Sequence, residues 1–86
     1  MNTMNPRVHK VIPLAKHRLE LYFTDGQVRL FDMTPYLGIG IFTELRDPAL
    51  FNTAVAALGT VTWANGADLC PDTLFLGSVE QQRKAG

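Results

Sequence analysis

The order of apolar and polar residues predicts a β-hairpin early in the chain. Apolar and polar side chains alternate over residues 19–23, Asp25-Gly26 follows, and the alternation resumes over residues 28–30. Asp-Gly is typical of a two-residue hairpin turn, and that turn fixes which residues lie opposite one another. The pairs expected across it are Thr24 with Gln27, Phe23 with Val28 and Leu21 with Leu30.

A strand is also predicted before this hairpin. Residues 8–14 are rich in branched apolar side chains, and the connection over residues 15–17 is short enough to return the chain antiparallel to a strand over residues 18–23. These segments together predict a three-stranded antiparallel meander.

The middle of the chain predicts helical structure. A short helical turn is expected over residues 34–37, with Thr34 as its cap and residues 38–40 ending it. The main helix is expected over residues 48–58, because apolar residues recur there at helical spacing after Asp47-Pro48. Gly59 is the expected left-handed cap at its end.

The last part of the chain predicts a second hairpin. Residues 60–63 and 68–70 have the composition of strands, and Asn65-Gly66 between them is a strong turn signal. A final helical turn is expected after Pro71, followed by a frayed tail over residues 80–86. The predicted fold is a single small α+β domain over residues 1–86, with a core from about residue 6 to residue 77 and the main helix between the meander and the second hairpin.

Composition and charge narrow the class of protein. The chain has 86 residues, 47% of them hydrophobic and 19% charged, which does not fit a disordered segment. Eight Lys and Arg balance eight Asp and Glu, and this balance disfavours a strongly basic nucleic-acid-binding protein.

Cysteine usage and targeting features predict a soluble cytoplasmic protein. Cys70 is the single cysteine, so it cannot form an internal disulfide or a multi-cysteine zinc site. The residues from Met1 to Pro6 do not resemble a signal peptide. The longest largely apolar run, residues 36–42, is much shorter than a membrane span.

The hairpin around Asn65-Gly66 contains the first candidate site. Trp63 could offer an apolar platform beside Asp68, which is expected to face it across the turn, and the two would form a small ligand or peptide pocket with Asn65. The alternative is that these residues serve the fold, because turn chemistry and a buried tryptophan need no further function.

Basic side chains near the start of the chain form the second candidate site. They are Arg7, His9, Lys10, Lys16, His17 and Arg18. Such a cluster could contact nucleic acid or an acidic partner. The alternative is a solvated strand edge, where lysines discourage aggregation.

The third candidate is the apolar run over residues 36–42. Its large side chains are Tyr36, Leu37, Ile39, Ile41 and Phe42. If exposed, they would form a protein-binding patch, and if buried, they would cover the sheet. No catalytic motif, metal-ligand spacing or cofactor-binding fingerprint is found, so neither a catalytic residue nor a metal or cofactor is expected.

Several segments in order resemble a small bacterial family, the domain of unknown function 2442. They are residues 8–14, 19–26, 32–37, 42–45 and 47–51, and above all the stretch Trp63-Ala64-Asn65-Gly66-Ala67-Asp68-Leu69-Cys70-Pro71-Asp72-Thr73-Leu74. The resemblance implies an α+β domain with a small antiparallel sheet and no established activity. It also implies gene pairing with another small protein, in arrangements that resemble toxin–antitoxin loci.

Three functional hypotheses follow. The leading one is a non-enzymatic protein-interaction module whose partner is another small protein. The alternative is a nucleic-acid-binding or transcription-regulatory accessory domain, suggested by the basic first eighteen residues and by longer relatives that carry a helix-turn-helix domain. An enzyme is the weakest hypothesis, since its carboxylates are scattered along the sequence. A homodimer is left open, because hairpin strands leave free sheet edges.

Overall fold

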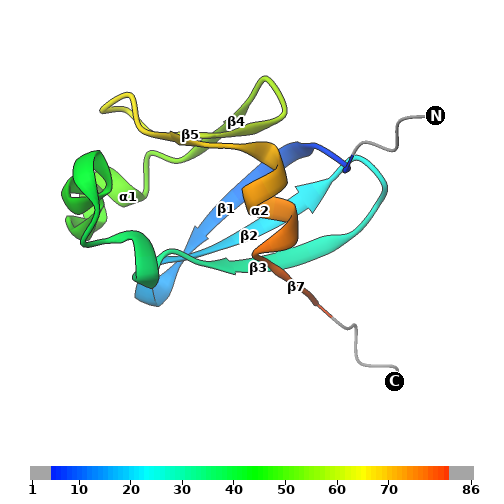
Figure 1. Cartoon of the computed structure of the whole chain (residues 1–86), viewed down its shortest axis with the longest axis horizontal. Helices are drawn as coiled ribbons and strands as arrows, with labels where there is room; N and C mark the ends of the chain where they lie inside the picture. Colours follow the sequence, from blue (N-terminus) through cyan, green and yellow to red (C-terminus); the bar gives the residue numbers. More distant parts are fainter. Residues whose placement is uncertain (1–4, 82–86) are drawn as a thin grey trace.

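The computed structural model describes residues 5–81, which form two antiparallel sheets joined by short helices (Figure 1). The larger sheet has the order β1 (Val8–Leu14), β2 (Arg18–Phe23), β3 (Val28–Asp32) and β7 (Val79–Glu80). The smaller sheet has the order β4 (Val55–Ala57), β5 (Thr60–Thr62) and β6 (Asp68–Leu69). The helices are η1 (Ala15–His17), η2 (Thr34–Tyr36), η3 (Gly40–Arg46), α1 (Pro48–Phe51) and α2 (Pro71–Leu76), and those written η are 3₁₀ helices. The predicted α+β class is confirmed.

The predicted meander is present, and it gains a strand. The bounds of β1 and β2 agree with the prediction, and both β1–β2 and β2–β3 pair antiparallel. β7 then pairs with β3, Val79 lying opposite Leu30. The predicted fraying is therefore wrong at Glu80, while residues 82–86 lie outside the described part of the chain.

The predicted register between β2 and β3 is wrong by one residue. The Phe23 N–H donates to the Gln27 carbonyl at 2.9 Å, so the connecting loop has three residues rather than two. Gly26 occupies the left-handed region at φ 92°, as expected at the third position of such a loop. The observed pairs are Tyr22 with Val28, Leu21 with Arg29, Glu20 with Leu30 and Leu19 with Phe31.

This shift moves Arg29 to the side of the sheet that faces the core. Its guanidinium donates to the Ser78 hydroxyl and the Ser78 carbonyl, both at 2.7 Å, and lies over the ring of Phe75 at 4.4 Å. These contacts fix the end of α2 against the larger sheet and bring the following residues to the edge of β3. The sequence pattern had placed Val28 and Leu30 on this side, but they share the opposite face with Glu20 and Tyr22.

The predicted main helix is also wrong in most of its length. Asp47 caps α1 as predicted, with its Oδ1 accepting from the Ala49 N–H at 3.0 Å, but α1 ends at Phe51. Residues 55–57 form β4, which pairs with β5. Gly59 has the predicted positive φ, but it lies in the β4–β5 turn and not at a helix end. Pairing with the neighbouring strand β5 has therefore overridden the helical spacing.

The hairpin of β5 and β6 has the same loop type as the β2–β3 hairpin. The Trp63 N–H donates to the Ala67 carbonyl at 2.9 Å, and Gly66 has φ 91°. Asp68 therefore lies opposite Thr62, and the prediction that it faces Trp63 is wrong.

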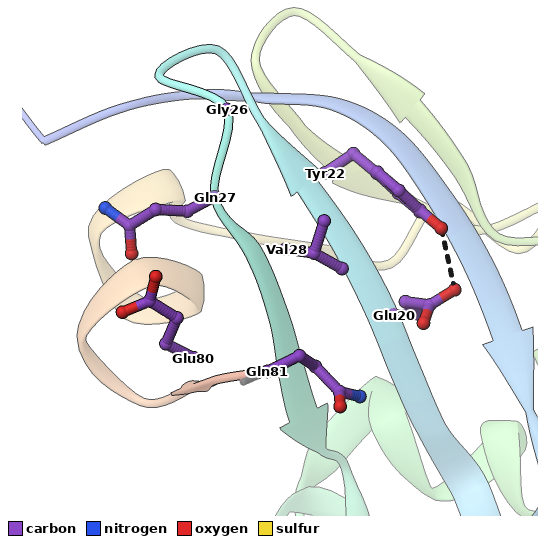
Figure 2. Close-up of a pocket in the computed structure, with 7 residues that line it drawn as sticks. All are labelled: Glu20, Tyr22, Gly26, Gln27, Val28, Glu80 and Gln81. Carbon is purple, nitrogen blue, oxygen red and sulfur yellow. Dashed lines mark hydrogen bonds between the residues drawn. The ribbon is translucent and has the colours of Figure 1, made fainter. Parts of the chain in front are cut away.

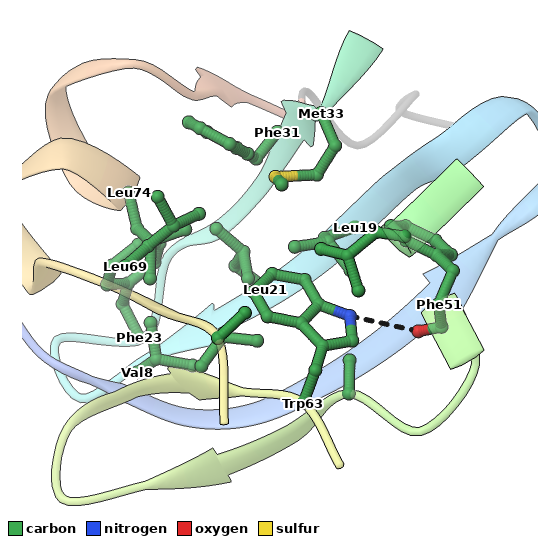
Figure 3. Packing of buried hydrophobic residues seen from close by; sticks show 14 residues of the cluster. Val8, Leu19, Leu21, Phe23, Phe31, Met33, Phe51, Trp63, Leu69 and Leu74 are labelled. Carbon is green, nitrogen blue, oxygen red and sulfur yellow. Dashed lines mark hydrogen bonds between the residues drawn. The ribbon is translucent and has the colours of Figure 1, made fainter. Parts of the chain in front are cut away.

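The core lies between the larger sheet, the smaller sheet and α2 (Figure 3). Its buried hydrophobic residues are Val8, Leu19, Leu21, Phe23, Phe31, Met33, Leu45, Phe51, Ala54, Val61, Trp63, Ala67, Leu69 and Leu74. All three alternate residues of β2 are buried, which accounts for the apolar periodicity of that strand.

Candidate partner-binding surface

The segment over residues 36–42 divides between the core and the solvent. Tyr36, Leu37 and Phe42 pack against the core, whereas Ile39 and Ile41 are 57% and 45% exposed. The two sequence-level alternatives, a core cover and an exposed patch, each describe part of this segment.

Aromatic contacts attach the segment to the core. The ring of Tyr36 lies 5.6 Å from that of Phe31 and 6.1 Å from that of Phe42, and Phe42 in turn lies 6.5 Å from Trp63. These centroid distances are in the range in which aromatic side chains attract one another.

Hydrogen bonds hold the exposed part in place. Arg46 Nε donates to the Leu37 carbonyl at 2.8 Å, and the Thr43 hydroxyl donates to the Gly40 carbonyl at 2.8 Å. The Phe42 N–H donates to the Ile39 carbonyl at 3.0 Å. The two isoleucines are thus exposed from a segment whose backbone is fixed on both sides.

The cap of η2 differs from the prediction. Thr34 does not cap the turn; instead its N–H donates to Asp32 Oδ1 at 2.9 Å. The hydrogen bonds from Thr34 hold the pKa of the Asp32 carboxyl below its usual value, and the positive charges of Arg18 and His17 add to this effect.

Trp63 and Asn65 support the segment rather than forming an open platform. Trp63 is only 4% exposed, and its Nε1–H donates to the Phe51 carbonyl at 3.0 Å (Figure 3). The Asn65 amide Nδ2 donates to Glu44 Oε1 at 2.8 Å, which ties the hairpin loop to η3. Asp68 is exposed, and in the strand register it lies opposite Thr62 and not opposite Trp63.

The structure does not bring the six basic residues into one patch. Arg7 and His9 lie at the start of β1, whereas Lys16 and His17 lie beyond its end, roughly 25 Å away along an extended strand. His17 Nε2 lies 3.2 Å from the Arg46 carbonyl, and its ring lies 5.0 Å from that of Phe51.

The remaining two basic residues are on the opposite face of the larger sheet from the core. Lys10 Nζ lies 5.2 Å from the centre of the Tyr22 ring, and Arg18 Nε donates to the Ala15 carbonyl at 3.3 Å. The side chains of Lys10 and Arg18 therefore each contact a residue close to them in the fold.

A hollow of about 330 Å³ lies near the start of β3 (Figure 2). Two carboxylates line it, those of Glu20 and Glu80, and the Tyr22 hydroxyl donates to Glu20 Oε1 at 3.0 Å. A second hollow of about 290 Å³ lies beside η1 and α1, where Pro13, Pro48 and Phe51 contribute apolar walls. Among residues 5–81, no three His, Cys, Asp or Glu side chains are grouped so that they could hold a metal ion.

Two features were missed at the level of sequence. Arg29 gave no signal as a core-facing residue, because its position depends on the length of the preceding loop. Leu58, 96% exposed in the β4–β5 turn, was assigned to a helix. Its signal was the Leu58-Gly59 pair itself, since glycine in that position also fits a hairpin turn.

The comparison with protein families gives one match. The family described as "Protein of unknown function (DUF2442)" matches residues 8–80. The chain belongs to this family. The resemblance seen in the sequence is thereby confirmed over nearly the whole described region.

The comparisons with curated proteins and with solved structures each returned no match. Within the described part of this DUF2442 chain, no helix is long and apolar enough to cross a membrane.

Proposed function

We propose that this chain is a non-enzymatic protein-interaction module, whose partner is a small protein encoded beside it in a toxin–antitoxin-like pair. The observation that carries the proposal is the exposure of Ile39 and Ile41 on a segment that is otherwise anchored in the core. The gene pairing implied by the family resemblance supports a neighbour-encoded protein as the partner.

The fixed backbone of this segment favours binding. An apolar side chain that is already held in place loses little conformational freedom when a partner covers it. Arg46 and Asn65 hold the segment through the Leu37 carbonyl and Glu44 respectively, so the two isoleucines form a small preorganised surface. Interface energy is commonly concentrated in a few such anchors.

The test is co-expression with the neighbour-encoded protein, followed by pull-down and isothermal titration calorimetry. We expect a stoichiometric complex, and we expect the double substitution Ile39→Asn/Ile41→Asn to weaken the Kd at least about tenfold. The matched control is Val79→Asn, which removes an apolar side chain that is 71% exposed on β7. This control should leave the Kd within about twofold, a change of less than half a kcal/mol.

Absence of a complex at micromolar concentrations would remove the proposal. A complex that is indifferent to both isoleucines would leave an interaction module but assign its surface elsewhere. Circular dichroism and thermal unfolding of each variant check that the fold is kept, which we expect because both side chains already face solvent.

A further inference from the structure

Two features of Leu58 each make leucine an unfavourable residue for the stability of the fold at this position. Its side chain is 96% exposed, and its backbone has φ 54°, in the left-handed region. A single exposed apolar residue is ordinary on a protein surface. A leucine that is fully exposed and also left-handed is not, because its Cβ crowds the backbone there and no burial compensates for the strain.

The turn itself would prefer another residue. Ala57 lies opposite Thr60, so Leu58 and Gly59 form a two-residue loop, and both have positive φ, as a type I′ turn requires. Asn, Asp and Gly are the favoured residues at the first position of this turn. In the three-residue loops of the β2–β3 and β5–β6 hairpins, by contrast, only the glycines Gly26 and Gly66 have positive φ.

The turn is fixed to the body of the protein. The Gly59 carbonyl accepts from the Val8 N–H at 3.0 Å, which links the tip to the start of β1. The Arg7 side chain lies so close that a Cβ added to Gly59 would be 2.8 Å from Arg7 Cδ. The β4–β5 turn lies at one end of the smaller sheet (Figure 1), and Leu58 within this turn is therefore held at a defined position.

We propose that Leu58 is an anchor for the partner protein and inserts into an apolar pocket of leucine size on that partner. This inference rests on the proposed function and adds a second contact to it. The exposed side chain supplies apolar area, and the fixed turn reduces the entropy lost on binding. One leucine on a tip is too small an anchor for a membrane surface, which requires more than one such signal.

The decisive variant is Leu58→Asn in the full chain. We expect it to raise the Tm by about 4 °C, because asparagine relieves the strain of the turn, and to weaken the Kd for the neighbour-encoded protein at least about tenfold. Leu58→Met keeps an apolar side chain and should keep the Kd within about threefold. Leu76→Asn, at a leucine that is 71% exposed on α2, is the matched control and should leave the Kd unchanged.

Each outcome decides the matter. A lower Tm for Leu58→Asn would show that the leucine serves the fold and would overturn the inference. An unchanged Kd for Leu58→Asn, with the complex intact, would overturn the inference and leave the proposed function standing. An equal loss for Leu76→Asn would indicate unspecific apolar adhesion and would also overturn it. Failure of the unaltered chain to bind would remove both proposals.

Discussion

Two turns lie at opposite ends of β5, and they use their residues differently. In the turn after β5, Asn65 Oδ1 accepts from the Ala67 N–H at 3.0 Å, and its Nδ2 donates to Glu44 at 2.8 Å. In the turn before β5, Leu58 is exposed and left-handed. Local sequence preference and fold agree in the first turn and conflict in the second. Such conflicts are where a role outside the fold is best sought.

The largest effect on stability should come from Trp63, the buried residue just before the Asn65 turn. Trp63→Ala removes a buried ring and its hydrogen bond to the Phe51 carbonyl, and we expect a loss of about 3–5 kcal/mol in the free energy of unfolding. Urea denaturation measures it. Leu58→Ala is the comparison and should change stability by less than about 0.5 kcal/mol. Similar losses for the two variants would contradict the distinction between the turns.

The glycines of the two turns offer a matched pair. Both have positive φ, but a Cβ at Gly66 meets nothing within 4 Å, whereas a Cβ at Gly59 would lie 2.8 Å from Arg7. We expect Gly66→Ala to cost about 1 kcal/mol and Gly59→Ala about 2 kcal/mol. In urea denaturation, adding Arg7→Ala to Gly59→Ala should bring the cost close to that of Gly66→Ala. If the second substitution gives no relief, Arg7 does not restrain the tip.

The hydrogen bonds of Asn65 predict a smaller effect. Asn65→Ala removes both and should cost about 1–2 kcal/mol. Asn65→Asp keeps the acceptor for the Ala67 N–H but places a second carboxylate near Glu44, so we expect it to recover only part of this stability. Thermal unfolding compares the variants. Full recovery by aspartate would show that the contact with Glu44 contributes nothing.

The sequence predicts strands well where alternation and burial coincide. β2 was predicted with its observed bounds because its alternate residues do face the core, whereas the bounds of β1, in which burial does not alternate, followed from its branched apolar composition. The positions of the Asp25-Gly26 and Asn65-Gly66 hairpin loops were predicted correctly, but their length was not. Asp-Gly and Asn-Gly fit two-residue and three-residue loops alike, and a difference of one residue reverses the face of every side chain that follows.

The remaining errors depend on contacts that the apolar and polar pattern does not reveal. Residues 50–58 have helical spacing, yet β4 forms because Val55–Ala57 pairs with β5, and Leu58 is then left in the turn. β7 depends on Arg29 holding Ser78, which follows from a register that the pattern had misassigned. Which side chains of residues 36–42 face the core depends on rings contributed by Phe31 and Trp63.

The smallest predicted effect is a pH dependence of the free energy of unfolding that comes from Asp32. Asp32 Oδ1 accepts from the Thr34 N–H at the first residue of η2, and η2 leads into the segment over residues 36–42. Its pKa is held below the usual value by Thr34 foremost, so its contribution to stability is present above about pH 4, the unfolded pKa, and is lost as the pH falls through the lower folded pKa.

Because the Asp32 carboxylate is exposed, we expect this contribution to be only about 0.5 kcal/mol. Asp32→Asn should therefore be slightly less stable than the unaltered chain at pH 7, and in thermal unfolding the difference should shrink as the pH falls below about 4. Leu58→Asn should show no such pH dependence, since neither side chain titrates. If the difference in stability persists unchanged in acid, the charge of Asp32 is not its cause. The effect of Asp32→Asn would then come from the geometry of the side-chain hydrogen bond, which does not depend on protonation.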